Sequence, residues 1–269
     1  MRPIATTTFG FLYRTSLDEA FRQIADAGYS RVELAVGPPH FESPPLGRDE
    51  RQRVKQQLES AGLSCVSTNP LELNPVTANP DLFEAARRQY EGAIELSADL
   101  GAQAVVMVAG RRSPLVPMSF EDANGLLAKM LEQLLPVADR LGVTLTVEAV
   151  PYGFIETGAQ ALAFMRATGL TDLKLTIDCA NVFFAGADPA VDVREVGPAV
   201  GVVHISDTWR KRWAHTQLGA GEVDLDAFAK AVDAIDFHGP TVYELADSED
   251  PAPRIRADIE RLASLGWTA

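Results

Sequence analysis

The segment Val202-Val203-His204-Ile205-Ser206-Asp207 is a short apolar run that presents an imidazole and a carboxylate where it ends. A run of this kind, rich in β-branched residues, is typical of a parallel strand that is buried on both faces. Three further apolar runs end in the same way, at Glu148, Asp178 and Glu244. Four successive strand-like runs therefore each finish on a group that can bind a metal ion.

Working outward from this region, short apolar segments alternate with amphipathic segments along the whole chain. Eight strands are predicted, at residues 4–8, 32–35, 64–67, 104–108, 144–148, 173–178, 201–206 and 241–244. Helices are predicted between them from apolar residues at helical spacing and from start and stop signals, such as Asn79-Pro80 before a long segment and Gly101 after it.

Eight strand-helix units predict an α/β protein with an all-parallel sheet closed into a (β/α)8 TIM barrel. We expect a single domain over residues 1–269, because barrels of this length commonly form one domain. A doubly wound open sheet is the alternative, but no GxGxxG motif follows the first strand to support dinucleotide binding.

Composition restricts the partners and the location. The net charge of −13 repels polyanions, which argues against nucleic acid and anionic membranes as partners. Cys65 and Cys179 are the only cysteines and are not in CxxC spacing, so a reducing compartment is expected. The first residues lack the pattern of a secretion signal, and no apolar run is long enough to span a bilayer. These features predict a cytoplasmic protein.

The four strand ends predict a metal centre. In parallel barrels the active site forms at the carboxyl ends of the strands, and Glu148, Asp178, His204 and Glu244 close strands five to eight, which are neighbours around the ring. Three carboxylates and one imidazole form a hard, oxygen-rich ligand set that favours Mn²⁺ or Mg²⁺, with Co²⁺ also suitable. Each residue alone could instead be a polar strand end bonded to a nearby loop, but four on adjacent strands favour a metal.

The order of these residues resembles the xylose isomerase-like TIM-barrel superfamily of sugar phosphate isomerases and epimerases and AP endonuclease 2-like proteins. The motifs that carry the resemblance are Val203-His204-Ile205-Ser206-Asp207 and Leu218-Gly219-Ala220-Gly221-Glu222-Val223-Asp224. The likeness covers nearly the whole chain and is strongest over residues 145–245. It implies that Glu148, Asp178, His204 and Glu244 bind one divalent metal ion, with Mn²⁺ as the first expectation. It also implies that Glu148 and Glu244 form the catalytic acid/base pair.

The resemblance predicts an isomerase or epimerase that acts on a small ketose, cyclitol or sugar phosphate through a metal-bound enediolate. The chemistry agrees, because a metal that holds two adjacent substrate oxygens lowers the cost of removing a proton from the neighbouring carbon. A metal-dependent dehydratase of a keto-cyclitol or of 3-dehydroshikimate is the main alternative. A non-catalytic sugar-binding barrel, or a subunit that needs a partner chain, is a third interpretation. Barrels of this superfamily also lead us to expect a homo-oligomer, either a dimer or a tetramer.

Six residues are candidates for substrate binding: Asn181, Asp207, Arg210, Arg212, His215 and His40. Asn181 stands where the family often has a histidine, and its amide can donate to a hydroxyl but cannot shuttle a proton. His215 lies in the loop before Gly219, where some relatives place a histidine. Arg210 and Arg212 could bind a phosphate or carboxylate of the substrate, although a short basic run is more often a solvated loop. His40 lies in the second loop, where a surface histidine is the alternative.

The endonuclease branch of the superfamily is a poor match. Its members use an Asp-x-His pair in the loop after the seventh strand, where this chain has Trp213-Ala214-His215. They also use a histidine after the third strand, and residues 64–79 contain none. Both differences argue against a DNA-repair function.

Overall fold

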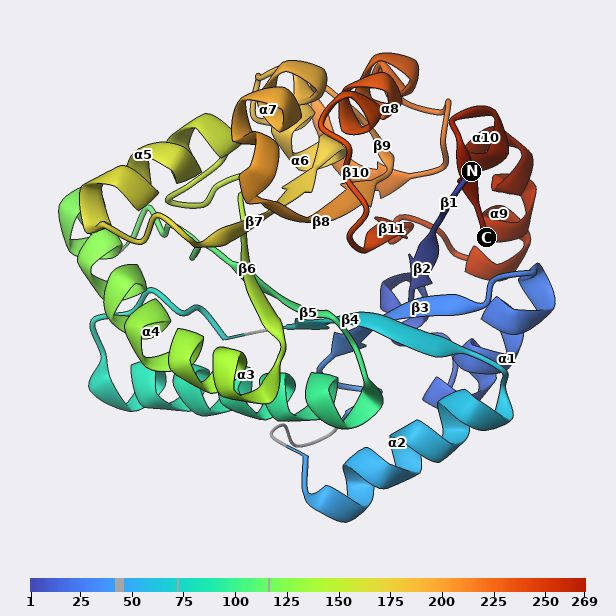
Figure 1. Ribbon diagram of the computed structural model, residues 1–269, viewed down its shortest axis with the longest axis horizontal. Coiled ribbons are helices and arrows are strands. Elements are labelled where there is room, and N and C mark those ends of the chain that lie inside the picture. Colours follow the sequence, from blue (N-terminus) through green and yellow to red (C-terminus); the bar gives the residue numbers. More distant parts are fainter. Residues whose placement is uncertain (42–45, 72, 116) are drawn as a thin grey trace.

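A closed barrel of eight parallel strands forms the centre of the computed structural model, which describes residues 1–41, 46–71, 73–115 and 117–269 (Figure 1). The strands are β2 (Ala5–Thr7), β3 (Arg31–Val36), β4 (Ser64–Pro70), β5 (Ala104–Val108), β6 (Thr144–Glu148), β7 (Lys174–Asp178), β8 (Val200–Ile205) and β11 (Thr241–Tyr243). Each strand pairs with the next one along the chain, and β11 pairs with β8 on one side and β2 on the other. The predicted TIM barrel and its eight strands are confirmed.

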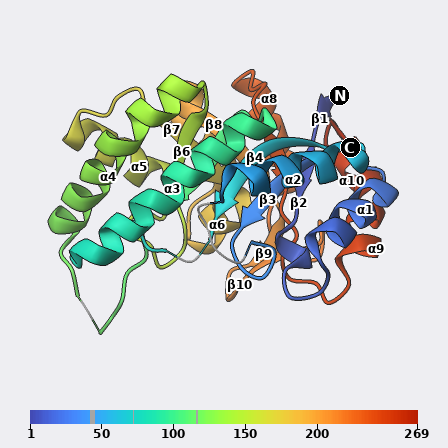
Figure 2. The same ribbon diagram turned by 90° about the horizontal axis from the view of Figure 1, so that it is seen from below.

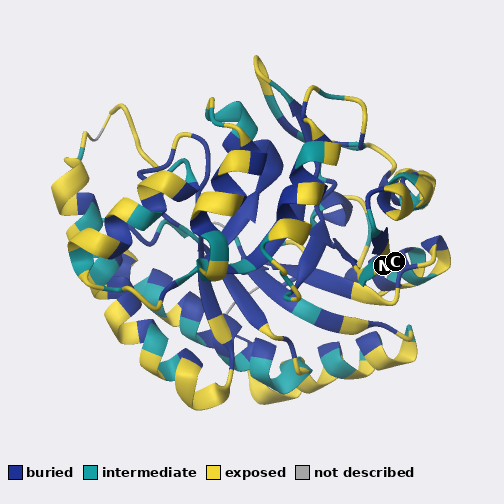
Figure 3. Ribbon diagram, turned by 45° about the horizontal axis from the view of Figure 1, so that its top comes forward, coloured by how far each residue is buried: buried dark blue, intermediate teal, exposed yellow. Residues whose placement is uncertain are grey.

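Helices surround the barrel, and most of the exposed residues lie on their outer sides (Figure 3). They are α1 (Leu17–Ala27), α2 (Arg48–Ser60), α3 (Pro80–Leu100), α4 (Phe120–Leu141), α5 (Gly158–Thr168), α6 (Cys179–Phe184), α7 (Pro189–Val196), α8 (Leu225–Ala234), α9 (Pro251–Ala257) and α10 (Ile259–Ser264), with short 3-10 turns at η1 (Phe9–Phe11) and η2 (Gly197–Ala199). α3 starts where the sequence predicts, since the side chain of Asn79 accepts hydrogen bonds from the first-turn amides. The side chains of Ser16, Ser119 and Thr157 cap α1, α4 and α5 in the same way. None of the helices in the described residues is long and apolar enough to cross a membrane.

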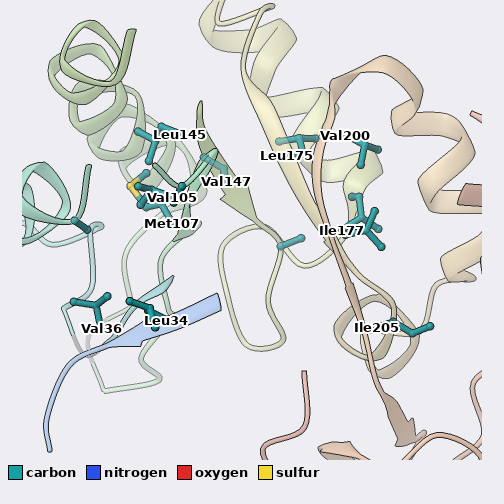
Figure 4. Close-up of a cluster of buried hydrophobic side chains, with 14 of the residues drawn as sticks. Leu34, Val36, Val105, Met107, Leu145, Val147, Leu175, Ile177, Val200 and Ile205 are labelled. Carbon is teal, nitrogen blue, oxygen red and sulfur yellow. The ribbon is translucent and has the colours of Figure 1, made fainter. Parts of the chain in front are cut away.

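The two faces of the strands have different roles. Alternate residues such as Leu145 and Val147 belong to the large apolar core that also takes in the buried faces of the helices (Figure 4). The residues between them, such as Thr146 and Glu148, belong to the other face, which lines the barrel interior. Inside the barrel a small separate cluster of Ala104, Val106 and Val202 is apolar. This alternation turns the polar strand ends toward the barrel axis.

Several short elements were not predicted. The loop after β8 contains a hairpin of β9 (Asp207–Trp209) and β10 (Arg212–Thr216), and α6 starts directly after β7. The closing helix is divided into α9 and α10 at Asp258, and β1 (Arg2–Pro3) pairs with β12 (Trp267–Thr268). Such elements are too short to show a hydrophobic period in the sequence. Figure 2 shows the β9–β10 hairpin on one side of the molecule and the two chain ends on the opposite side.

Candidate active site

The four predicted strand-end residues meet in one buried cluster. One ligand atom from each of Glu148, Asp178, His204 and Glu244 lies within 4.8 Å of the others. The Nδ1 atom of His204 is 3.5 Å from Glu148 Oε1, 3.9 Å from Asp178 Oδ2 and 2.9 Å from Glu244 Oε2. The cluster forms because the four side chains come from β6, β7, β8 and the end of β11, which are neighbours in the barrel.

Several polar atoms of this cluster are buried without a hydrogen-bond partner. Within the described part of the chain this holds for Asp178 Oδ2, His204 Nδ1 and Glu244 Oε2. The last two are close together, but their arrangement does not meet the geometry of a hydrogen bond. Leaving a buried polar atom unpaired costs about 1–3 kcal/mol, so three such atoms around one point fit a site for a cation. The oxygen-rich donor set fits a hard divalent metal ion.

The pKa shifts of the cluster carboxylates also fit a site for a divalent cation. Burial raises the pKa of Asp178 to about 7, and the nearby carboxylates of Glu244 and Glu148 act in the same direction. Burial likewise raises the pKa of Glu148. Burial also acts on Glu244, but the imidazoles of His215 and His204 outweigh it and lower the pKa of Glu244 to about 2. Crowded buried carboxylates repel one another, and a divalent cation relieves this repulsion.

Glu33 is a site residue to which the sequence analysis gave no role. It lies on β3, is fully buried, and its Oε2 accepts hydrogen bonds from Ser67 Oγ at 2.6 Å and from His204 Nε2 at 3.1 Å. A carboxylate that accepts the Nε2–H of a histidine leaves Nδ1 free to act as a ligand and fixes the plane of the ring. The signal in the sequence is the single acid inside the apolar run Val32-Glu33-Leu34-Ala35-Val36.

A second layer of polar contacts surrounds Glu148. The side chain of Asn181 donates from Nδ2 to Glu148 Oε1 at 3.2 Å and accepts from Trp213 Nε1 at 2.9 Å. The backbone N–H of Asn181 also donates to Asp178 Oδ1 at 2.7 Å, because Asp178 caps the start of α6. The unpredicted helix α6 therefore places Asn181 beside the cluster.

His215 borders the cluster on the other side. Its Nδ1 atom lies 3.6 Å from Asp178 Oδ2 and 3.7 Å from Glu244 Oε2, and it is hydrogen-bonded to Ser206 Oγ at 3.0 Å. Burial opposes the charged ring, but Glu244 and Asp178 raise the pKa of His215 above its usual value. The structure therefore brings both Asn181 and His215 to the predicted site.

A cavity of about 640 Å³ adjoins the cluster. Of the four cluster residues, Glu148 and Glu244 line it. Its other polar lining residues include Asn69, Asn74, Arg111, Asn181, Arg212, Trp213, His215 and Asp247, and its apolar ones include Phe9, Leu71, Leu73, Val108 and Val150. A volume in the range of about 300–1,000 Å³ with a few convergent polar groups is typical of a small-molecule site.

The other predicted substrate-binding residues have different surroundings. Asp207 is buried and accepts hydrogen bonds from the backbone amides of Thr208, Gly219 and Val223. Arg210 donates to the carbonyls of Phe183 and Ala187.

His40 is hydrogen-bonded from Nε2 to the carbonyl oxygen of Thr15 at 3.0 Å. Arg212 lines the cavity but is paired with Asp247. The substrate contacts predicted for Asp207, Arg210 and His40 thus stay predictions, and these side chains have structural partners.

The fold is therefore a (β/α)8 barrel. The buried carboxylates and the imidazole at its strand ends form a candidate metal centre. A family model described as xylose isomerase-like TIM barrel matches residues 21–265. The chain belongs to this family, as the resemblance of its motifs predicts.

Individual relatives are similar over most of their length. A ketose 3-epimerase from Arthrobacter globiformis is 27% identical over 252 residues, which cover 89% of this chain and 80% of that protein. An L-ribulose 3-epimerase from Methylomonas sp. (strain DH-1) is 26% identical over 244 residues, with coverage of 88% and 81%. Among solved structures, an L-ribulose 3-epimerase superposes with a TM-score of 0.81 at 20% identity, covering 98% of this chain and 94% of that one, and this likeness supports the fold.

Proposed function

We propose that this protein is a divalent-metal-dependent isomerase of the epimerase type, which inverts a carbon next to the carbonyl of a small ketose or related polyol. The observation that carries the proposal is the position of Glu148 and Glu244, the two cluster carboxylates that line the cavity. They come from β6 and from the end of β11, with β7 and β8 between them. Two carboxylates separated in this way can address opposite faces of one substrate carbon.

In this mechanism one glutamate removes the proton beside the carbonyl, which leaves an enediolate, and the other returns a proton to the opposite face. Asn181 Nδ2 holds Glu148 Oε1 in place at 3.2 Å, and Trp213 in turn holds Asn181. His215 faces Glu244 and lines the cavity, where it can hydrogen-bond a substrate hydroxyl. Glu148, Asp178, His204 and Glu244 would hold a divalent cation, which would supply positive charge to polarise the substrate carbonyl. We propose Mn²⁺ as that ion, with Mg²⁺ or Co²⁺ as alternatives.

The named relatives support epimerisation over dehydration. Two of the relatives similar in sequence are called ketose 3-epimerase and L-ribulose 3-epimerase. Both epimerisation and dehydration begin with the same proton removal, but only dehydration requires the loss of a hydroxyl group. The dehydratase interpretation has no comparable support.

The test is turnover of L-ribulose, D-tagatose and D-fructose by the Mn²⁺-loaded protein in D₂O, followed by nuclear magnetic resonance. We expect a C3 epimer that carries deuterium at the inverted carbon. Glu148→Gln and Glu244→Gln should each lower the epimerisation rate by about 10²–10⁴-fold, because each removes one of the two proton-transfer groups. Each variant should still exchange deuterium into one of the two epimers, since the remaining carboxylate addresses one face.

The matched control is Glu84→Gln, which changes an exposed carboxylate on α3 and should leave the rate unchanged. Metal content is measured in every variant, so that loss of the ion is distinguished from loss of the acid or base. A new ultraviolet chromophore without an epimer would identify a dehydratase, and absence of turnover with any ketose would contradict the proposal.

A further inference from the structure

The cavity has a larger volume than the reacting part of a ketose requires. Its volume of about 640 Å³ lies in the middle of the range of roughly 300–1,000 Å³ that is typical of pockets for drug-sized ligands. Glu148 and Glu244 are buried at its inner end, whereas Arg111 is exposed and lines its outer part. A substrate whose carbonyl end reaches the glutamates therefore leaves room for a further group beside Arg111.

Arg111 is a cation without a counter-charge in the part of the chain that the structure describes. No described carboxylate lies within ion-pair distance of its guanidinium, although the chain carries a net charge of −13. The neighbouring arginines are engaged, since Arg112 pairs with Glu156 and Arg212 pairs with Asp247. Among the described residues, Arg111 is thus the cavity-lining arginine that pairs with no carboxylate.

The backbone of Arg111 is held from both sides. The side chain of Asn74 donates to the Arg111 carbonyl oxygen at 2.9 Å and accepts from the Arg111 amide at 3.2 Å. An antiparallel bridge joins Arg111 to Gly153. The preceding Gly110 has a φ of +93°, and a Cβ atom there would lie 2.4 Å from a methyl group of Val76. A fixed backbone lowers the entropy that must be lost when the side chain binds a ligand.

The guanidinium of Arg111 is connected to Glu148 through a series of side-chain contacts. It lies over the ring of Trp213, 6.0 Å from the ring centroid, and Trp213 donates to Asn181, which donates to Glu148. A ligand that spans from Glu148 to Arg111 would follow the wall formed by Trp213. The same ring can pack against the apolar face of such a ligand.

From these contacts we propose that the outer part of the cavity is an oxyanion subsite centred on Arg111, and that the substrate is a ketose with a phosphate or carboxylate group at the end remote from its carbonyl. An arginine presents paired N–H donors that match both groups. This inference rests on the proposed function for the identity of the carbonyl end, whereas the oxyanion subsite depends only on Arg111 and its surroundings.

The experiment measures binding of unreactive polyols to the Mn²⁺-loaded protein by isothermal titration calorimetry. D-Glucitol 6-phosphate and D-gluconate carry the two kinds of oxyanion, and D-glucitol is the neutral reference. We expect the wild-type protein to bind at least one anionic polyol about tenfold or more tightly than D-glucitol. The anion that gains more identifies phosphate or carboxylate as the preferred group.

The variants Arg111→Gln and Arg112→Gln decide where the preference arises. Arg111→Gln should abolish it and leave the affinity for D-glucitol unchanged, whereas Arg112→Gln should retain it, because Arg112 is paired with Glu156 outside the cavity lining. Equal affinities for charged and neutral polyols in the wild type, or equal losses in both variants, would overturn the inference. Turnover of neutral ketoses reports on the proposed function separately, so the two ideas can fail independently.

Discussion

Glu33 shows how much a single buried residue can contribute to this site. Its carboxylate accepts from His204 Nε2 at 3.1 Å and is itself anchored by Ser67. This contact turns the unpaired Nδ1 atom of His204 toward the three carboxylates. Glu33 therefore orients His204 without belonging to the four-residue cluster itself.

Replacing Glu33 by glutamine should weaken metal binding by about 10–100-fold, because the negative charge that orients His204 and makes it more basic is lost while the shape is kept. Titration with Mn²⁺, with free ion measured by electron paramagnetic resonance, gives the affinity directly. Ser67→Ala is the control and should cause a smaller loss, since it removes one hydrogen bond to Glu33 but keeps the charge. An unchanged affinity in Glu33→Gln would show that His204 is oriented by the barrel alone.

At the residue level, the proximity of side chains could be predicted from the sequence where chain order determines it. Glu148, Asp178, His204 and Glu244 could be expected to meet because the carboxyl ends of neighbouring parallel strands converge. The contact of Glu33 with His204 could not be predicted in this way, since β2 and β11 lie between β3 and β8 in the ring. That Arg111 pairs with none of the described carboxylates was equally hidden, because ion pairing depends on which carboxylates the folded chain places near each arginine.

At the level of elements, the loop after β8 is built around Asp207. Its carboxylate accepts from the amides of Thr208, Gly219 and Val223 at 2.9, 2.9 and 3.0 Å. These bonds tie together the two ends of the segment that contains the β9–β10 hairpin, which carries Trp213 and His215 into the cavity wall. The sequence indicates a loop here, but its hairpin depends on these long-range bonds rather than on local periodicity.

Asp207→Asn should lower the free energy of unfolding by about 1–3 kcal/mol, because the amide group of asparagine would place a donor against at least one of the three backbone donors. Urea unfolding followed by circular dichroism measures the change. Asp247→Asn, which removes an exposed ion pair with Arg212, should cost at most about 1 kcal/mol. If Asp207→Asn instead kept full stability and raised only KM, the predicted substrate contact of Asp207 would be the better explanation.

At the level of the whole molecule, the sequence predicts the barrel well because eight alternating units allow few arrangements other than a closed parallel sheet. Gly101 illustrates the local agreement, since it ends α3 in the left-handed conformation that favours glycine. The expected dimer or tetramer stays a prediction, because association depends on the match between two surfaces and not on the order of strands and helices.

The candidate metal site joins four neighbouring strands of the closed barrel, so on the proposed function metal removal should affect the stability of the whole fold. An ion that binds the folded chain and not the unfolded one stabilises it by about 2.7 kcal/mol when its free concentration is 100 times its Kd. For a chain of this size we expect Mn²⁺ to raise Tm by roughly 5–10 °C, and EDTA to reverse the increase. Differential scanning calorimetry measures the shift.

His204→Ala is the variant that ties this stabilisation to the cluster. It should bind little Mn²⁺ by elemental analysis after dialysis, and its Tm should not respond to the ion, because a ligand that faces all three carboxylates has been removed. His238→Ala is the matched control, since that histidine is exposed beside Asp236 and should leave both the metal content and the shift intact. If neither Mn²⁺ nor EDTA changed the Tm of the wild-type protein, the buried carboxylates would be stabilised by protons and hydrogen bonds alone. The proposed metal-dependent epimerase would then lose its structural basis.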